Sequence, residues 1–204
     1  MAITSNMPSR NIKGNVKAQD KILYVANKLG LSSLKYMQAT TRCIYDAVPY
    51  AAGSPSVTLF ENSQSRNFPQ TNISTSGNRF EVNEALLVEK IAFFTLDDLG
   101  QNVGNMNNFD GATSVKFDLI IGNKTVMKDL VMESNGEQAF YASGTGASSQ
   151  INLEGVGILI PPQVEFKVVA MAFNTDARTA TTLETNLGCY LYGTGVLLNF
   201  NTSI

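Results

Sequence analysis

Short apolar runs separated by clusters of Gly, Asn, Ser and Pro recur along this chain from about residue 55 to its C-terminal end. The clearest run is Val115–Ile121, in which apolar residues alternate with Lys116 and Asp118. Because side chains of a strand point to opposite faces in turn, this alternation predicts a half-buried strand. Gly122–Lys124 then predicts a tight turn, and Thr125–Met132 predicts the returning strand of a hairpin.

Other segments between these turn signals also predict strands. Leu86–Leu96 is long, apolar and free of Gly and Pro, which favours a central strand, although periodicity alone leaves a helix open. In the run Gly188–Phe200, Gly193 and Gly195 predict a bulge or a sharp bend. The low-complexity stretch Ser143–Gln150 predicts a flexible loop instead. The remaining predicted strands are Val57–Phe60, Ile151–Leu153, Gly157–Ile160, Val164–Phe173 and Gly188–Phe200.

This pattern gives about eight strands without strand–helix–strand alternation, which indicates an all-β fold of two packed antiparallel sheets. The architecture we expect is an antiparallel β-sandwich of the jelly-roll type. An immunoglobulin-like sandwich and a closed barrel stay open as alternatives, because strand order cannot be read from one sequence.

The N-terminal part of the chain has a different pattern. Residues 1–14 show no periodicity, which predicts an arm, whereas Val16–Leu29 has the spacing of an amphipathic helix. Asn15 is a suitable N-cap, and Gly30 is placed to end the helix. We therefore divide the chain into a basic arm with a short helix over residues 1–45 and a β-sandwich body over residues 46–204. The stripe expected to face the body comprises Val16, Gln19, Ile22, Leu23, Ala26 and Leu29.

Charge is unevenly distributed between these two parts. The net charge is -2, yet residues 1–45 hold seven basic groups against Asp20 alone, which gives +6 there and -8 in the remainder. Such asymmetry indicates a polyanionic partner or electrostatic docking between copies, while a solvated helix face is the simpler alternative. The residues assigned to the assembly or nucleic-acid arm are Arg10, Lys13, Lys17 and Lys21.

The chain contains no histidine, so it lacks the commonest general base, metal ligand and pH switch. Its two cysteines do not make a disulfide framework or a zinc site, and Cys189, within an apolar run, is expected to be a small core residue. We therefore expect no enzyme, no catalytic, metal or cofactor site, and no small-molecule substrate. An enzyme that uses carboxylates alone stays as a weaker alternative, with Asp97, Asp98, Glu81, Glu84 and Glu89 as candidates. The loop Asp97–Gly111 could hold calcium, although it does not match an EF-hand.

Composition also bears on the partners. No stretch approaches the roughly 18 consecutive apolar residues of a membrane span, and the first residues do not read as a signal peptide. Only 16% of residues are charged, where soluble domains usually carry roughly a quarter. A surface this poor in charge suits a protein packed against neighbours, and an Asn-rich β surface explains it equally well.

Three groups of residues carry a resemblance to a known family. The basic residues from Arg10 to Lys21 precede a β body, the segment FPQTNI (Phe68–Ile73) leads toward a long strand, and ILIPPQVEFKVV (Ile158–Val169) is a strand–Pro–strand passage. In these respects the chain resembles the single jelly-roll capsid proteins of small icosahedral viruses, especially bacteriophages. The resemblance implies a non-enzymatic virion protein, assembled in the host cytoplasm, that forms an icosahedral shell.

The same resemblance implies partners. These are copies of the chain and other virion proteins, with an N-terminal arm that contacts either neighbouring subunits or genomic nucleic acid. Deletion of residues 1–45 is then expected to leave a folded body that assembles poorly. The alternative is a carbohydrate-binding or receptor-binding sandwich, such as a head fibre, that uses Tyr141, Asn107 and Asn108.

Overall fold

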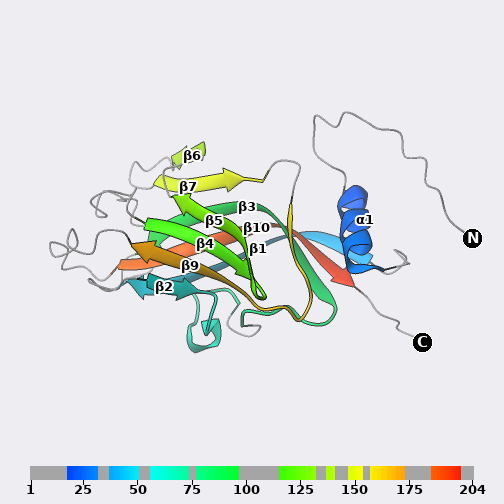
Figure 1. The fold of residues 1–204 in the computed structure, drawn as a ribbon, viewed down its shortest axis with the longest axis horizontal. Coiled ribbons are helices and arrows are strands. Elements are labelled where there is room, and N and C mark those ends of the chain that lie inside the picture. The colour runs from blue at the N-terminus through cyan, green and yellow to red at the C-terminus, as the bar shows by residue number, and fades with distance from the viewer. Residues whose placement is uncertain are drawn as a thin grey trace, which may run out of the picture.

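The computed structural model describes nine ranges of the chain: 18–31, 37–50, 56–73, 77–96, 115–131, 137–140, 147–153, 157–172 and 185–198. Within them the chain forms a helix near its N-terminus, a series of strands and a short 3-10 helix (Figure 1). In chain order the elements are α1 (Ala18–Leu29), β1 (Met37–Tyr50), β2 (Ser56–Leu59), η1 (Ser63–Ser65), β3 (Glu84–Leu96), β4 (Val115–Ile121), β5 (Lys124–Val131), β6 (Glu137–Phe140), β7 (Ala147–Asn152), β8 (Ile158–Ile160), β9 (Phe166–Ala172) and β10 (Thr185–Leu198).

The strands form two antiparallel sheets. Sheet A has the order β1-β10-β3-β7-β6, with β8 also paired to β3, and sheet B has the order β2-β9-β4-β5. Counted outward from the β4–β5 turn, the strands other than β6 pair with a counterpart in the other half of the chain: β3 with β7 and β8, β2 with β9, and β1 with β10. The chain is therefore a long hairpin rolled into two sheets, which is the jelly-roll arrangement. The fold predicted from the sequence is confirmed.

Most of the predicted strands are present with small shifts of their ends. The hairpin of β4 and β5 follows the predicted turn closely, and Leu86–Leu96 lies in β3, the central strand of sheet A. Three elements differ from the prediction. β1 and β6 were not predicted, and the Ala147–Gln150 part of β7 falls in the stretch that we expected to be a flexible loop. β1 also runs through residue 45, where we divided the arm from the body.

The main core lies between the two sheets. Its largest buried side chains are aromatic; the Phe93 and Phe117 rings stack across the sheets with centroids 3.7 Å apart, and Phe80 and Phe166 lie 5.4 Å apart. The expected inward face of β4 is confirmed, because Phe117 and Leu119 are buried. These side chains hold sheets A and B together.

A β-bulge in β3 keeps its apolar side chains on the core face. Tyr192 of β10 is opposite Lys90, but the next residue, Gly193, is opposite Val88, so Glu89 is the extra residue. Leu86 and Val88 point into the core before the bulge, and Ile91 and Phe93 do so after it. Since side chains alternate with period 2, the inserted residue shifts the pattern by one position and lets both apolar stretches face inward. The sequence predicted a bulge or bend in the last strand, around Gly193 and Gly195, whereas the extra residue lies in the strand opposite, β3.

Helix α1 covers one end of the outer face of sheet A (Figure 1). Its last turn closes as a Schellman motif, in which Leu31 N–H donates to the carbonyl of Ala26 and Gly30 N–H donates to that of Asn27. Gly30 has φ 69°, the left-handed conformation that glycine adopts without strain. Helix and sheet share a second apolar cluster, made of Val25, Ala85, Leu87, Val196 and Leu198.

The predicted helix is confirmed over its described residues, and its buried face needs one correction. Gln19 is exposed, while Val25, which was not in the predicted stripe, is fully buried. The proposed N-cap Asn15 and Val16 lie outside the described residues. In the part of the chain that the structure describes, no helix combines the length and the apolar character that crossing a bilayer requires.

Candidate assembly surface

Of the four residues assigned to the arm, Lys21 is the one that the structure describes. It lies on α1, and its Nζ is 2.5 Å from Oε1 of Glu89 and 3.3 Å from Oγ1 of Thr194. The Thr194 hydroxyl in turn donates to Oε2 of Glu89 at 3.2 Å. The bulge supplies the acceptor, because Glu89 is its extra residue. Lys21 therefore fastens α1 to sheet A, while Arg10, Lys13 and Lys17 lie outside the described residues.

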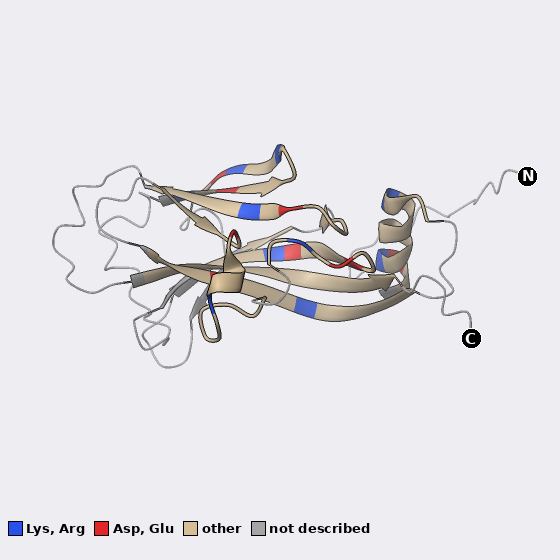
Figure 2. Ribbon diagram, turned by 90° about the horizontal axis from the view of Figure 1, so that it is seen from below, with Lys and Arg blue, Asp and Glu red and all other residues tan. Residues whose placement is uncertain are grey.

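A second basic residue from the N-terminal 45 is also neutralised within the chain. Nη1 of Arg42 is 2.8 Å from Oε2 of Glu84, and its guanidinium carbon lies 4.8 Å from the centroid of the Phe80 ring. Figure 2 shows basic and acidic residues interspersed over the described strands rather than gathered by sign. Lys21 of α1 and Arg42 of β1 are thus both paired with acidic residues of β3. Part of the positive charge of residues 1–45 is therefore neutralised within the chain.

The segment 60–73 covers the free edge of β1. Ala47 N–H donates to the carbonyl of Gln70 at 2.8 Å, and Tyr45 N–H donates to Oδ1 of Asn72 at 2.8 Å. The Asn72 amide donates back to the carbonyl of Cys43 at 2.8 Å. An uncovered edge strand presents unpaired backbone groups to other chains. Here the segment satisfies these groups itself, so this part of β1 is closed to strand addition.

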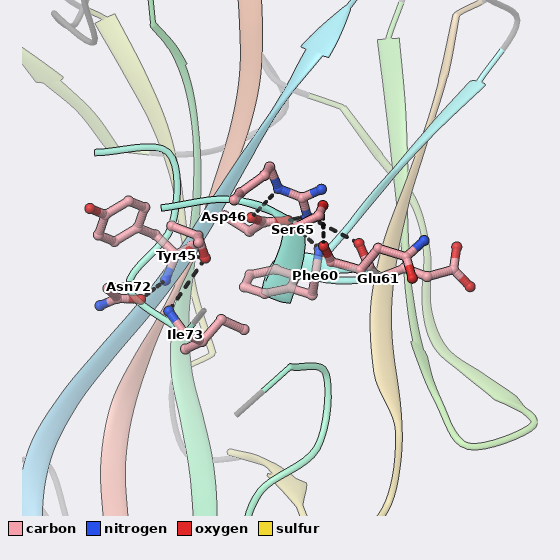
Figure 3. A network of polar contacts seen from close by, with 10 residues as sticks. Tyr45, Asp46, Phe60, Glu61, Ser65, Asn72 and Ile73 are labelled. Carbon is pink, nitrogen blue, oxygen red and sulfur yellow. Dashed lines mark hydrogen bonds and ion pairs between the residues drawn. The ribbon is translucent and has the colours of Figure 1, made fainter. Parts of the chain in front are cut away.

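The buried ion pair between Arg66 and Asp46 also attaches this segment to β1 (Figure 3). The carboxylate of Asp46 on β1 is 0% exposed, and Arg66 approaches it with Nε 3.0 Å from Oδ1 and Nη2 2.5 Å from Oδ2. Phe60 N–H donates to Oδ2 at 2.6 Å, and Nη2 of Arg66 also donates to the carbonyl of Glu61 at 3.0 Å. Every polar contact of this carboxylate therefore ties β1 to the segment. Sequence reasoning missed the site; its one signal was the acidic Asp46 between apolar Ile44 and Val48.

Between these two attachments the segment presents Phe68 to solvent. The Phe68 side chain is 81% exposed, the highest value among the exposed large apolar residues that the structure describes. The turn that carries it is closed by two bonds to the carbonyl of Asn67, from Gln70 N–H at 2.8 Å and from Thr71 N–H at 3.3 Å. An aromatic side chain is thus held in water by a fixed turn. The segment FPQTNI, which contributed to the family resemblance, is this turn.

The carboxylates considered for catalysis are not gathered into one site within the described residues. Glu84 and Glu89 are each bound by a different basic side chain, and Glu81 is exposed. Asp97 and Asp98, the candidate calcium loop 97–111, and the sugar-binding candidates Tyr141, Asn107 and Asn108 lie outside the described residues. Among the residues that are described, no group of three or more Cys, Asp or Glu side chains could hold a metal ion.

Both cysteines are free thiols. Cys189 is fully buried in the main core, as predicted, and burial raises its pKa well above the ordinary value. Cys43 is half-buried on β1, and burial raises its pKa as well. Since the thiolate is the nucleophilic form, these surroundings suit packing rather than reactivity.

The sequence matches no model of a known protein family, and it is similar to no curated protein at a significant level. The candidate function therefore rests on the fold and on the geometry described above.

Proposed function

We propose that this chain is a non-enzymatic virion structural protein, a capsid subunit that assembles with copies of itself into a closed icosahedral shell. The observation that carries the proposal is the strand order of the two sheets, which is that of the jelly roll found in capsid proteins and also in lectin domains. Because one fold can serve several functions, the strand order alone does not establish a capsid role.

The edges of the two sheets supply a second argument. The β1 edge is covered by segment 60–73 from Cys43 to Ala47, and the β2 edge is only four residues long. At the opposite edge of sheet B, β5 carries exposed Lys124 and Lys128 and is distorted at Asp129, where φ is 54°. Charges, bulges and short edge strands all disfavour indiscriminate pairing between sheets. Copies of such a protein meet through loops and faces of fixed shape, as a closed shell requires.

The proposal predicts assembly of the purified protein. We expect the full chain, concentrated at several ionic strengths, to form closed particles of uniform size in negative-stain electron microscopy and sedimentation velocity. A protein that stays monomeric at every concentration and salt condition would contradict it. Binding of that monomer to a glycan array would favour the carbohydrate-binding alternative, which shares the jelly-roll fold.

The arm predicts a specific salt dependence of nucleic-acid binding. Replacing Arg10, Lys13 and Lys17 together by Gln should reduce the slope of log K against log salt by about 2 for a single-stranded oligonucleotide. The measurement is fluorescence anisotropy over a salt series. The matched control replaces Lys28, Lys124 and Lys128, which are exposed on α1 and β5. Equal losses in the two triple variants would show that only net charge matters and would contradict a role for the arm.

These substitutions are a better test than the deletion that the sequence suggested. Deleting residues 1–45 would remove α1 and the Met37–Tyr45 part of β1, which is paired residue by residue with β10. It would also remove Ile44 from the main core. The deletion therefore tests folding, whereas substitutions before residue 18 leave every described contact in place.

A further inference from the structure

We propose that Phe68 is the anchor of a contact between two copies of this chain. The inference rests on the proposed function, since it names one contact of the assembly. It starts from the segment 60–73, whose attachments to β1 are described above.

The turn that carries Phe68 is already ordered in the isolated chain. The turn Asn67–Thr71 is closed by its own backbone bonds, and its two ends are fixed by Arg66 on one side and Asn72 on the other. Binding through such a turn costs little further ordering of the backbone. Large aromatic side chains are also the residues that most often dominate the energy of a protein interface. A fixed turn that holds a phenylalanine in water has the properties of a preformed anchor.

The charge of the segment favours a second copy of this chain as the partner that Phe68 contacts. Within residues 62–73 the one ionic side chain is Arg66, and Asp46 neutralises it. At the border of the segment, Glu61 is neutralised by Lys167, whose Nζ is 3.3 Å from Oε1. A surface without net charge does not repel its own copy, and it offers nothing to attract a nucleic acid or an anionic lipid surface. The other polar residues of the segment are uncharged Asn, Gln, Ser and Thr, which matches the depletion of charge at interface cores.

Other exposed apolar residues lack this combination. Val82 is 64% exposed in the turn that precedes β3, but it is small and aliphatic. It therefore serves as a matched control, because its replacement removes a comparably exposed apolar side chain from another turn of the same protein.

The experiment compares full-length wild-type protein with Phe68→Ser, Phe68→Leu and Val82→Ser. Circular dichroism and thermal unfolding should be unchanged in all three variants, because both side chains are mostly in water. The concentration at which half of the protein is assembled is then measured by sedimentation velocity and light scattering. We expect Phe68→Ser to raise this concentration roughly 30-fold, the effect of losing an interface hot spot. Phe68→Leu should restore part of the affinity, and Val82→Ser should behave as wild type.

Each outcome decides between the two proposals. If the wild-type protein assembles and Phe68→Ser assembles at the same concentration, the anchor is wrong while the capsid proposal stands. Equal weakening by Phe68→Ser and Val82→Ser would also overturn the anchor, because general surface apolarity would then explain both. If the wild-type protein never assembles, both proposals are overturned, including the case in which the monomer uses Phe68 to bind a sugar.

Discussion

Arg66→Ala is expected to lower the free energy of unfolding by about 3–5 kcal/mol, because it leaves the carboxylate of Asp46 buried without its cationic partner. Asp46 is 0% exposed, and Phe60 N–H would be its one remaining described donor. Breaking a buried pair from one side costs far more than removing both members, since the surviving charge is left without solvent or partner. The measurement is urea unfolding followed by circular dichroism.

The controls for this prediction come from the same chain. Lys167→Ala removes a surface ion pair with Glu61, whose partners are 37% and 45% exposed, and should cost about 1 kcal/mol or less. The double variant Asp46→Ala with Arg66→Ala should be more stable than the sum of the two single losses predicts. A loss below about 1 kcal/mol for Arg66→Ala would show that water reaches the carboxylate and that the pair does not hold the segment.

Gly193→Ala is expected to cost about 3 kcal/mol, the upper part of the range for overpacking a well-packed site. A Cβ at this position would lie 1.9 Å from the carbonyl oxygen of Leu87 and 2.9 Å from the amide nitrogen of Glu89. Both atoms belong to the backbone of β3 beside the bulge, so no side-chain rotation relieves the clash and the two central strands must separate. The melting temperature should fall by about 6–12 °C for a chain of this size.

Gly195→Ala is the matched control on the same strand. A Cβ there would lie 3.0 Å from Cβ of Arg42 and 3.1 Å from its Cδ, so the neighbouring strand must give by only a few tenths of an ångström. We therefore expect a smaller loss than at Gly193. If the two substitutions cost the same, the close approach of β10 to the β3 backbone is not what requires glycine at position 193.

The sequence predicts this fold well wherever one strand face is apolar and the turn residues are distinctive. The β4–β5 hairpin shows both signals, with clean alternation before Gly122 and a short return strand. β3 was found by its apolar length, but the bulge in it was not, because the glycines Gly193 and Gly195 pointed to a bulge or bend in their own strand, β10. Local patterns of this kind depend on a few neighbouring residues, so they can be recognised from one sequence.

The elements that were missed depend on distant partners. β1 begins with polar residues such as Thr40 and Thr41 and carries Asp46 on its inner face, so its pattern is not that of an apolar strand. Only Arg66 and Phe60 N–H, brought from the next segment, make Asp46 acceptable in the interior. The polar first half of β7 is likewise a strand because the β3 and β6 backbones pair with it. The anchor Phe68 could not be predicted, because sequence does not reveal whether an apolar residue is exposed.

The rolled hairpin also governs when the molecule can be completed during synthesis. β10 lies between β1 and β3 in sheet A and pairs with both. A nascent chain that has emerged only as far as β9 has no strand to join these two, and the outer cluster under α1 lacks Val196 and Leu198. Closing such long loops is slow compared with local folding. Sheet A therefore stays incomplete until β10 has emerged, with β1 not yet joined to the strands around β3.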